Sequence, residues 1–321
     1  MARIVSLGSS LEDIYLIDRD DFASQKLLDK SLFGRLEIGS KADIDKIKFF
    51  IGGGGTNSAV TFARNNHEAI LFSNIGADPA GEAVLKKLDE EGIDRSYVEI
   101  SKRKNTGTSI ILLDSKSGER TILTFRGVSA KFDNLNEADL DYINPDWLYI
   151  TTLRGDTGTL LRFIEKAKSL GVKIMFNPGV LEFENKKQLL GLLPDVDVLL
   201  LNKEEASRLV PGVLLSELLA RLKNYTPSVI ITDGAMGGIA TNGTETYRFG
   251  IYEDVKVKDT TGAGDAFGSG FLAALAAGKS FRTSLIFASA NSTSVVQQLG
   301  AKNGTLTLSE TNLHPMPIQR I

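Results

Sequence analysis

Residues 258–275 have the sequence KDTTGAGDAFGSGFLAAL, in which a glycine-rich turn leads into a run of small residues that predicts a helix. Gly262, Ala263 and Gly264 leave the backbone of this turn uncrowded, so their N–H groups and the helix N-terminus can face an anion such as a phosphoryl group. Asp265 would lie at the edge of that site, where its carboxylate can take a proton from an attacking hydroxyl. The alternative is a helix N-terminus that Asp265 merely caps.

Strands and helices alternate along most of the chain before this turn. Short apolar runs predict buried strands, and amphipathic segments between them predict helices, one of which ends at Gly92. The strand segments are 3–7, 69–76, 147–152, 173–177, 196–202 and 228–233, and the helical segments are 57–66, 81–92, 159–171 and 204–209. Repeated strand–helix units predict an α/β fold, with a mostly parallel central sheet covered by helices on both faces.

Two excursions interrupt this alternation. Residues 13–51 contain the strand-like stretches DIYLID and IDKIKFFIG, and residues 105–127 contain TGTSIILLD and RTILTFRG, joined by a turn-forming SKSGE. We expect the excursions to pair as a small β lid on a single domain that spans 1–321. GSSLED at 8–13 is expected to be a polar loop, and the tail at 314–321 to be irregular.

Composition narrows the classes of function. The 321 residues are 42% hydrophobic and 24% charged with a net charge of −3, and no run of Lys or Arg could follow a nucleic acid backbone. The absence of Cys and the presence of two isolated His argue against disulfides and a zinc centre. No signal peptide and no stretch of membrane-spanning length is recognisable, so we expect a cytoplasmic protein with no membrane or nucleic acid partner.

A second glycine cluster, IGGGGTNSAV at 51–60, allows a ligand to approach the backbone, and its Asn57 can donate and accept hydrogen bonds. Alone, it could be a flexible turn before a helix. The two clusters occur in family order with GSSLED, NKEEA at 202–206 and ITDGAMGG at 231–238. In this arrangement the chain resembles the ribokinase-like (PfkB) family of carbohydrate kinases over nearly its whole length.

The resemblance implies a three-layer α/β/α fold and ATP-dependent phosphorylation of a hydroxyl, expected to be a primary one, on a small unphosphorylated sugar or sugar derivative. It makes Asp265 the catalytic base and the backbone of 262–264 the anion hole. The residues implied to bind the substrate are Asp13, Gly53, Gly54 and Asn57. Without the resemblance, Asp13 could equally be a solvated loop residue.

On the nucleotide side, the resemblance assigns Asn202 and Glu205 to positioning Mg²⁺ and the phosphates through water. It assigns Thr232, Gly234 and Gly237 to the loop that approaches the nucleotide. Many members also hold a monovalent cation such as K⁺, and the matching residues here are Asp259, Thr261, Val295, Gln298 and Gly300. The alternatives are a plain helix N-cap, a turn and a salt-tolerant loop, respectively.

Three positions bear on the substrate. Gly54 stands where sugar kinases of this family often have Lys, and Arg154 stands where ribokinase presents an acidic residue. Arg126, at the end of the predicted lid hairpin, could recognise a carboxylate or phosphate, although it could also be a surface arginine. Convergence of Arg126 and Arg154 would favour an acidic sugar.

Other interpretations remain open. A nucleoside kinase of the same family is the alternative, and a sugar-sensing protein without turnover is a further one. The lid could form a homodimer interface through apolar residues such as Leu32, Phe33 and Ile38. Trp147 is expected in the core, and His67 and His314 on the surface without a role.

Overall fold

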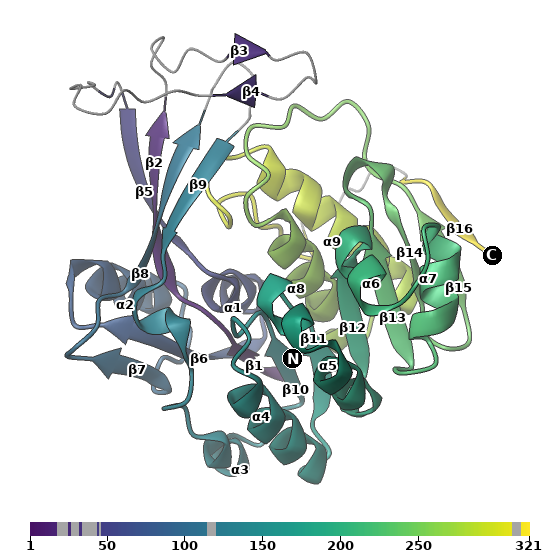
Figure 1. Cartoon of the computed structure of the whole chain (residues 1–321), viewed down its shortest axis with the longest axis horizontal. Helices are drawn as coiled ribbons and strands as arrows, with labels where there is room; N and C mark the ends of the chain where they lie inside the picture. Colours follow the sequence, from purple (N-terminus) through teal and green to yellow (C-terminus); the bar gives the residue numbers. More distant parts are fainter. Residues whose placement is uncertain (18–24, 27–31, 34–43, 45, 114–119, 310–315) are drawn as a thin grey trace.

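The computed structural model describes residues 1–17, 25–26, 32–33, 44, 46–113, 120–309 and 316–321 (Figure 1). Within this part of the chain, ten strands form one sheet in the order β16-β15-β14-β13-β12-β11-β10-β1-β6-β7. The parallel strands are β1 (Arg3–Leu7), β6 (Glu68–Gly76), β7 (Val98–Ser101), β10 (Trp147–Ile150), β11 (Lys173–Phe176), β12 (Val198–Asn202) and β13 (Ser228–Thr232). The antiparallel ones are β14 (Gly238–Thr241), β15 (Thr246–Phe249) and β16 (Ile318–Arg320).

Helices cover both faces of this sheet because side chains of successive strand residues point to opposite faces. Ile4 of β1 belongs to one hydrophobic cluster, whereas Val5 and Leu7 belong to the other. The first cluster is closed by α1 (Gly54–Arg64), α2 (Pro79–Glu90), α8 (Ala263–Ala276) and α9 (Phe281–Val296). The second is closed by α3 (Leu140–Ile143), α4 (Thr157–Ser169), α5 (Lys186–Leu192), α6 (Lys203–Leu209) and α7 (Leu215–Leu222). The predicted three-layer α/β/α class is confirmed.

A second sheet projects from the body of the molecule (Figure 1). Its strands are β5 (Lys46–Gly52), β2 (Leu11–Ile17), β8 (Gly107–Leu113) and β9 (Arg120–Phe125), in that order. The β2–β8 pair is parallel and the outer pairs are antiparallel. Both excursions therefore contribute strands to the lid. A further pair of two-residue strands is formed by β3 (Gln25–Lys26) and β4 (Leu32–Phe33).

Three expectations about local structure are wrong. GSSLED is not all loop, because β2 begins at Leu11 and places Asp13 in a strand. The tail is not all irregular, since 318–320 pairs with β15. His67 is buried rather than exposed: its Nδ1 accepts a hydrogen bond from the N–H of Ala2 at 3.2 Å, and its Nε2 lies 2.9 Å from the carbonyl oxygen of Ala273.

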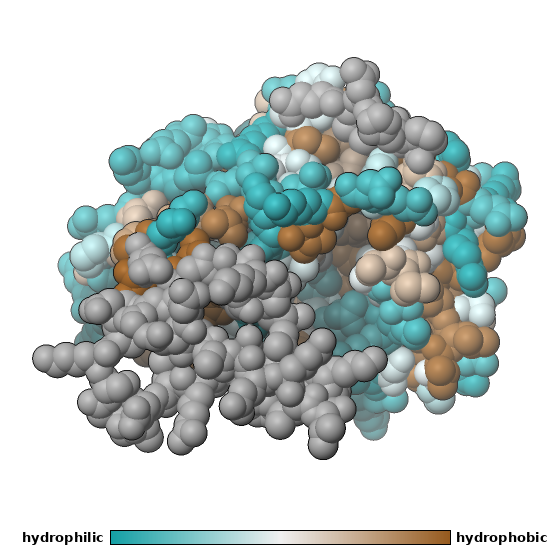
Figure 2. All heavy atoms as spheres, turned by 90° about the horizontal axis from the view of Figure 1, so that it is seen from above, coloured by the Kyte–Doolittle hydropathy of each residue, from teal (hydrophilic) through white to brown (hydrophobic). Residues whose placement is uncertain are grey.

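Trp147 lies in the core, as predicted. Ile38, His314 and the side chains of Leu32 and Phe33 lie outside the described residues. Among the described residues, no helix combines the length and the apolar character needed to cross a membrane. Seen from above, the surface that the grey residues leave visible carries separate hydrophobic areas among hydrophilic ones (Figure 2).

Candidate active site

The glycine-rich turn at 259–264 lies at the start of α8 and borders a cavity of about 380 Å³. Gly262 has φ +77°, in the left-handed region, and a Cβ there would lie 2.4 Å from the Cβ of Ala301. Only glycine fits this position without displacing its neighbour. The turn thus brings the first N–H groups of a 14-residue helix to the cavity, where they can bind an anion.

Asp265 lies in the first turn of α8 and also lines this cavity. Asn57 of α1 donates a hydrogen bond from Nδ2 to Asp265 Oδ2 at 2.8 Å. Burial raises the pKa of Asp265, whereas the Asn57 hydrogen bond and the positive charge of Lys302 act in the opposite direction. A second link joins the helices, since Ser269 Oγ lies 2.9 Å from Thr61 Oγ1. The two glycine clusters are therefore held together at the proposed base.

Asp13 is buried on β2, beside the glycine cluster at 51–60. A Cβ on Gly52 would lie 2.0 Å from Asp13 Oδ2, so the absence of a side chain at 52 makes room for this carboxylate. Burial raises the pKa of Asp13 to about 6, although the charge of Lys302 and a hydrogen bond from Ser109 oppose the change. Gly53 has φ +96°, which turns the backbone into α1.

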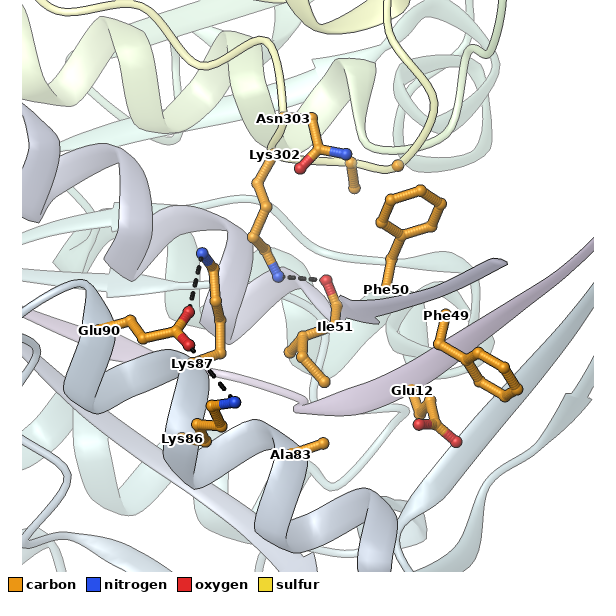
Figure 3. A pocket seen from close by; sticks show the side chains of 12 residues that line it. Glu12, Phe49, Phe50, Ile51, Ala83, Lys86, Lys87, Glu90, Lys302 and Asn303 are labelled. Atoms are coloured by element: carbon orange, nitrogen blue, oxygen red, sulfur yellow. Dashed lines mark hydrogen bonds and ion pairs between the residues drawn. The ribbon is translucent and has the colours of Figure 1, made fainter. Parts of the chain in front are cut away.

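Lys302 lies in a loop near the C-terminal end of the chain and contacts the glycine cluster at 51–60. Its Nζ donates hydrogen bonds to the carbonyl of Ile51 and to Thr56 Oγ1, and its side chain is buried (Figure 3). Burial lowers the pKa of Lys302 to about 7, although the carboxylates of Asp13 and Asp265 act against the change. Lys302 also borders a separate cavity of about 290 Å³ next to α2, whose lining side chains are drawn in Figure 3. The buried ammonium thus supports the backbone of the glycine cluster through Ile51 and Thr56.

The nucleotide-side residues surround the other end of the large cavity. Asn202 and Glu205 form a capping box at α6: the Glu205 N–H donates to Asn202 Oδ1, and the Asn202 N–H donates to Glu205 Oε2, each at 2.8 Å. Both line the cavity. A smaller cavity of about 160 Å³ is lined by Thr232, Gly234 and Gly237, and it shares Gly264 with the larger one.

Glu205 is one of the two residues that the family resemblance assigns to positioning Mg²⁺. Burial raises the pKa of its carboxyl to about 7, although the hydrogen bond from the Asn202 N–H and the charge of Arg208 act against the change. No group of three or more acidic or imidazole side chains suited to a metal occurs in the described ranges. An ion there would fit only if phosphate oxygens and water completed its shell, which is how Mg²⁺ binds at many phosphate sites.

Asp259 is the one carboxylate among the residues that the family resemblance assigns to a monovalent cation. It is buried, and Thr261 N–H donates to Oδ1 at 2.9 Å, while the Tyr15 hydroxyl and the Gly300 N–H donate to Oδ2 at 2.6 and 3.2 Å. Arg120 Nε lies 3.9 Å from Oδ1. A carboxylate with this many donors and an arginine beside it does not fit a K⁺ ligand.

Arg126 and Arg154 are not brought together around either cavity. Among the residues that the structure describes, neither lines the cavities that contain Asp265 or Gly234. Arg126 is exposed where β9 ends. Arg154 is half-buried with φ +58°, and its Nε is buried without a hydrogen-bond partner in the described part of the chain.

Sequence reasoning missed several residues of the site. Arg120 and Ile122 of β9 line the large cavity, together with Thr151, Thr152 and Asn177 beyond β10 and β11. A signal existed for these: Arg120 and Ile122 alternate on one face of a predicted strand, and the other three lie at the C-terminal ends of predicted strands, where parallel sheets carry ligands. No sequence pattern pointed to Lys302, since its role depends on contacts with residues about 250 positions earlier.

The family model described as pfkB family carbohydrate kinase matches residues 1–308. The chain belongs to this family. The predicted enzyme class, a carbohydrate kinase, is thereby confirmed. Among its relatives, a ribokinase from Bacillus subtilis is 29% identical over 266 residues, which are 81% of this chain and 85% of that protein. An ATP-dependent 6-phosphofructokinase from Thermoanaerobacterium thermosaccharolyticum is 26% identical over 276 residues, with 83% and 84% covered.

Solved structures share the fold of this pfkB family kinase. The Methanocaldococcus jannaschii nucleoside kinase superposes with a TM-score of 0.76 at 22% identity, and 96% of each chain is covered. The Arabidopsis thaliana ribokinase, complexed with ribose and ATP, gives 0.76 at 23% identity with 95% of each chain covered. These likenesses support the architecture, whereas the roles of individual residues rest on the geometry described above.

Proposed function

We propose that this kinase transfers the γ-phosphoryl group of ATP to a primary hydroxyl of a small unphosphorylated sugar or sugar derivative. The observation that carries the proposal is the position of Asp265. Its carboxylate borders the turn at 262–264 on one side and accepts a hydrogen bond from Asn57 of the 51–60 glycine cluster on the other. A base between an anion site and a polar acceptor site suits in-line transfer to a hydroxyl.

In the proposed reaction, the hydroxyl oxygen of the acceptor forms a bond to the γ-phosphorus of ATP. Asp265 accepts the proton that this hydroxyl loses. The bond from that phosphorus to the bridging oxygen breaks, and ADP leaves. The N–H groups of 262–264 stabilise the negative charge on the phosphoryl oxygens, which is where such donors are most effective. The raised pKa of Asp265 makes its carboxylate a better proton acceptor than an ordinary aspartate.

ATP would lie along the two connected cavities, with its phosphates towards Gly264 and its nucleoside towards Thr232, Gly234 and Gly237. Asn202 and Glu205 would hold Mg²⁺ through water. The metal, when bound, neutralises phosphate charge and orients the phosphates. Both side chains line the large cavity, beside the turn at 262–264, which supports this placement.

The acceptor is proposed to be uncharged. Arg120 is the one cationic side chain among the described residues that line the large cavity, and Gly54 offers no charge to a substrate phosphate. Asp13 and Asn57 instead offer hydrogen-bonding groups suited to several hydroxyls. A nucleoside remains the alternative, because Ile122 adds an exposed apolar surface over the cavity and a nucleoside kinase from Burkholderia thailandensis, complexed with inosine, has the same fold.

A homodimer through the lid is also proposed. Direct strand partners Phe49, Ile14, Ile110 and Leu123 lie in one row across the four lid strands, and Ile47, Leu16 and Leu112 lie in the next. Paired residues of a sheet share a face, and here it is the face opposite buried Tyr15 and Ile111. Phe49 and Leu123 are 58% and 53% exposed. A second lid would cover this apolar face.

A coupled ADP-release assay tests the proposed reaction. The protein is supplied with ATP and Mg²⁺ and screened against pentoses, hexoses, sugar acids and nucleosides, beside Asp265→Asn and the surface control Asp141→Asn. We expect turnover on one class of acceptor, retained in Asp141→Asn and reduced roughly 10²- to 10⁴-fold in Asp265→Asn. Calorimetric titration with ATP shows whether the inactive variant still binds the nucleotide. Full activity of Asp265→Asn would refute the assigned base.

A further inference from the structure

The carboxylate of Asp259 is 1% exposed and lies beside the anion-binding turn, where the family resemblance expects a monovalent cation. Its two oxygens already accept three hydrogen bonds. They come from the Thr261 N–H at 2.9 Å, the Tyr15 hydroxyl at 2.6 Å and the Gly300 N–H at 3.2 Å. A buried carboxylate that is bonded in this way is satisfied without a metal ion.

Two of the carbonyls that were expected to bind the cation accept hydrogen bonds from within their own loop. The carbonyl of Val295 accepts the Gln298 N–H at 3.0 Å, and the carbonyl of Gly300 accepts the Asn303 N–H at 3.5 Å. These bonds leave a second lone pair on each oxygen, so they do not by themselves exclude a cation. Asp259, Val295 and Gly300 thus have partners within the protein, whereas Thr261 Oγ1 is buried without a hydrogen-bond partner among the described residues.

The positive charge near Asp259 is supplied by Arg120. Its Nε lies 3.9 Å from Asp259 Oδ1, and its side chain is 25% exposed. This distance is an ion pair but not a hydrogen bond, and the Arg120 Nε is buried without a hydrogen-bond acceptor among the described residues. A guanidinium held with an unused N–H is positioned to bind a further anion.

The same arginine borders the transfer site. It lines the cavity that also contains Gly262, Gly264 and Asp265. It comes from β9, in the lid, whereas Asp259 belongs to the body of the molecule. The ion pair thus spans the two parts of the fold beside the anion-binding turn.

We propose that Arg120 replaces the monovalent cation in this kinase. Its guanidinium neutralises Asp259 and provides fixed positive charge next to the anion hole, and a K⁺ ion at the same carboxylate would be repelled by it. The inference deepens the proposed phosphoryl transfer and rests on it. It requires that K⁺ confer no advantage on the wild-type protein, and that removal of the guanidinium create a need for a cation.

The test compares K⁺, Na⁺ and tetramethylammonium chlorides at equal ionic strength. Wild-type kcat/KM should agree within about twofold among the three salts. Arg120→Ala should lose at least tenfold in tetramethylammonium and recover part of that loss in K⁺. Arg120→Lys keeps a positive charge, so its kcat/KM in tetramethylammonium should lie between those of the wild type and Arg120→Ala. The surface variant Arg95→Ala should behave as wild type.

Thermal unfolding in the same salts gives a readout that does not need turnover. The Tm of the wild type should not differ between K⁺ and tetramethylammonium, whereas the Tm of Arg120→Ala should rise in K⁺. A several-fold stimulation of the wild type by K⁺, or its stabilisation by K⁺ alone, would overturn the proposal, as would an Arg120→Ala protein that is fully active and indifferent to salt. If no acceptor is phosphorylated in any salt, the proposed reaction fails, and the thermal comparison still decides the role of Arg120.

Discussion

Asn57 and Asp265 are separated by 208 positions, yet Asn57 Nδ2 donates a hydrogen bond to Asp265 Oδ2 at 2.8 Å. The first residue belongs to the cluster expected to bind the acceptor, and the second is the proposed base. Thr61 and Ser269, one turn further along the same two helices, repeat the link at 2.9 Å. The acceptor side and the phosphoryl side are therefore held in one geometry by two rigid helices, as in-line transfer requires.

The first prediction concerns the pH dependence of Asn57→Ala. Burial raises the pKa of Asp265, and the Asn57 hydrogen bond partly opposes this by stabilising the ionised form. Removal of the bond raises the pKa further, so the acidic limb of kcat/KM should move to higher pH, by about one unit. Asn57→Ala should also weaken substrate binding, which lowers kcat/KM at every pH. Only the altered pKa of Asp265 shifts the acidic limb of the pH profile.

Initial rates from pH 4 to pH 9 are the measurement, and Asn224→Ala, at an exposed helix end, is the control. An acidic limb that stays in place in Asn57→Ala would show that this limb does not belong to Asp265, or that the bond is absent in the working enzyme.

The second prediction concerns Gly262→Ala. This substitution places a Cβ at φ +77° and 2.4 Å from the Cβ of Ala301. Gly278→Ala is a matched control, because Gly278 has φ +80° but nothing within 4 Å of its added Cβ. Both variants should lose about 1 kcal/mol of unfolding free energy from the backbone, and Gly262→Ala should lose a further 1–3 kcal/mol from the clash, along with its turnover.

Urea unfolding of the two variants, followed by circular dichroism, separates these contributions. Equal losses of unfolding free energy in the two variants would mean that the turn at 259–264 can move away from Ala301 without loss of stability. That result would contradict close packing between Gly262 and Ala301.

Packing between distant segments, such as that of Gly262 against Ala301, could not be predicted from the sequence. Glycines at fixed positions and the alternation of strand and helix patterns predicted the parallel sheet, the covering helices and the turn that precedes α8, because these depend on local spacing. The β14–β15 hairpin was missed, since two four-residue strands are too short to show a period. Asp13 was placed in a loop, although Leu11, Asp13 and Tyr15 alternate inward along β2.

Tertiary contacts account for the remainder of the differences. His67 follows a helix among polar residues, yet backbone groups from Ala2 and Ala273 enclose it. Lys302 lies in a loop with no apolar pattern, and only the folded chain brings it to Ile51 and Thr56. Contacts of this kind depend on packing between distant segments, which neither propensity nor periodicity encodes.

The third prediction concerns acid stability and Glu91. Burial alone would raise the pKa of Glu91, but hydrogen bonds and charges from Arg64 and Lys87 outweigh it and lower the pKa to about 2. Arg64 donates from Nη2 and Nε to the two carboxylate oxygens at 2.6 and 2.9 Å. Between pH 2 and 4.5 the unfolded chain binds more protons at this residue, so its stabilisation is complete above pH 4.5 and is lost as the pH falls towards 2.

Glu91→Gln should therefore be less stable than the wild type by about 2 kcal/mol at neutral pH, with the difference narrowing below pH 4.5. The free energy of unfolding as a function of pH is the measurement, with exposed Glu165→Gln as control. A difference that stays constant from pH 7 to pH 3 would count against the ion pair as its source.

The fourth prediction concerns the apolar outer face of the lid. If two lids pack through the rows that contain Ile47 and Leu123, a lysine at either position buries a charge in the interface and should weaken association by at least 2 kcal/mol, roughly thirtyfold. Ile100→Lys is the matched control, because Ile100 is 50% exposed on β7 of the central sheet, outside the lid. Light scattering after size-exclusion chromatography should show a dimer for wild type and Ile100→Lys, and a monomer for Ile47→Lys and Leu123→Lys at micromolar concentration. A wild-type protein that is monomeric at 100 μM, or lysine variants that remain dimeric, would refute a dimer interface on this face of the lid. The lid would then cover the substrate without a partner subunit.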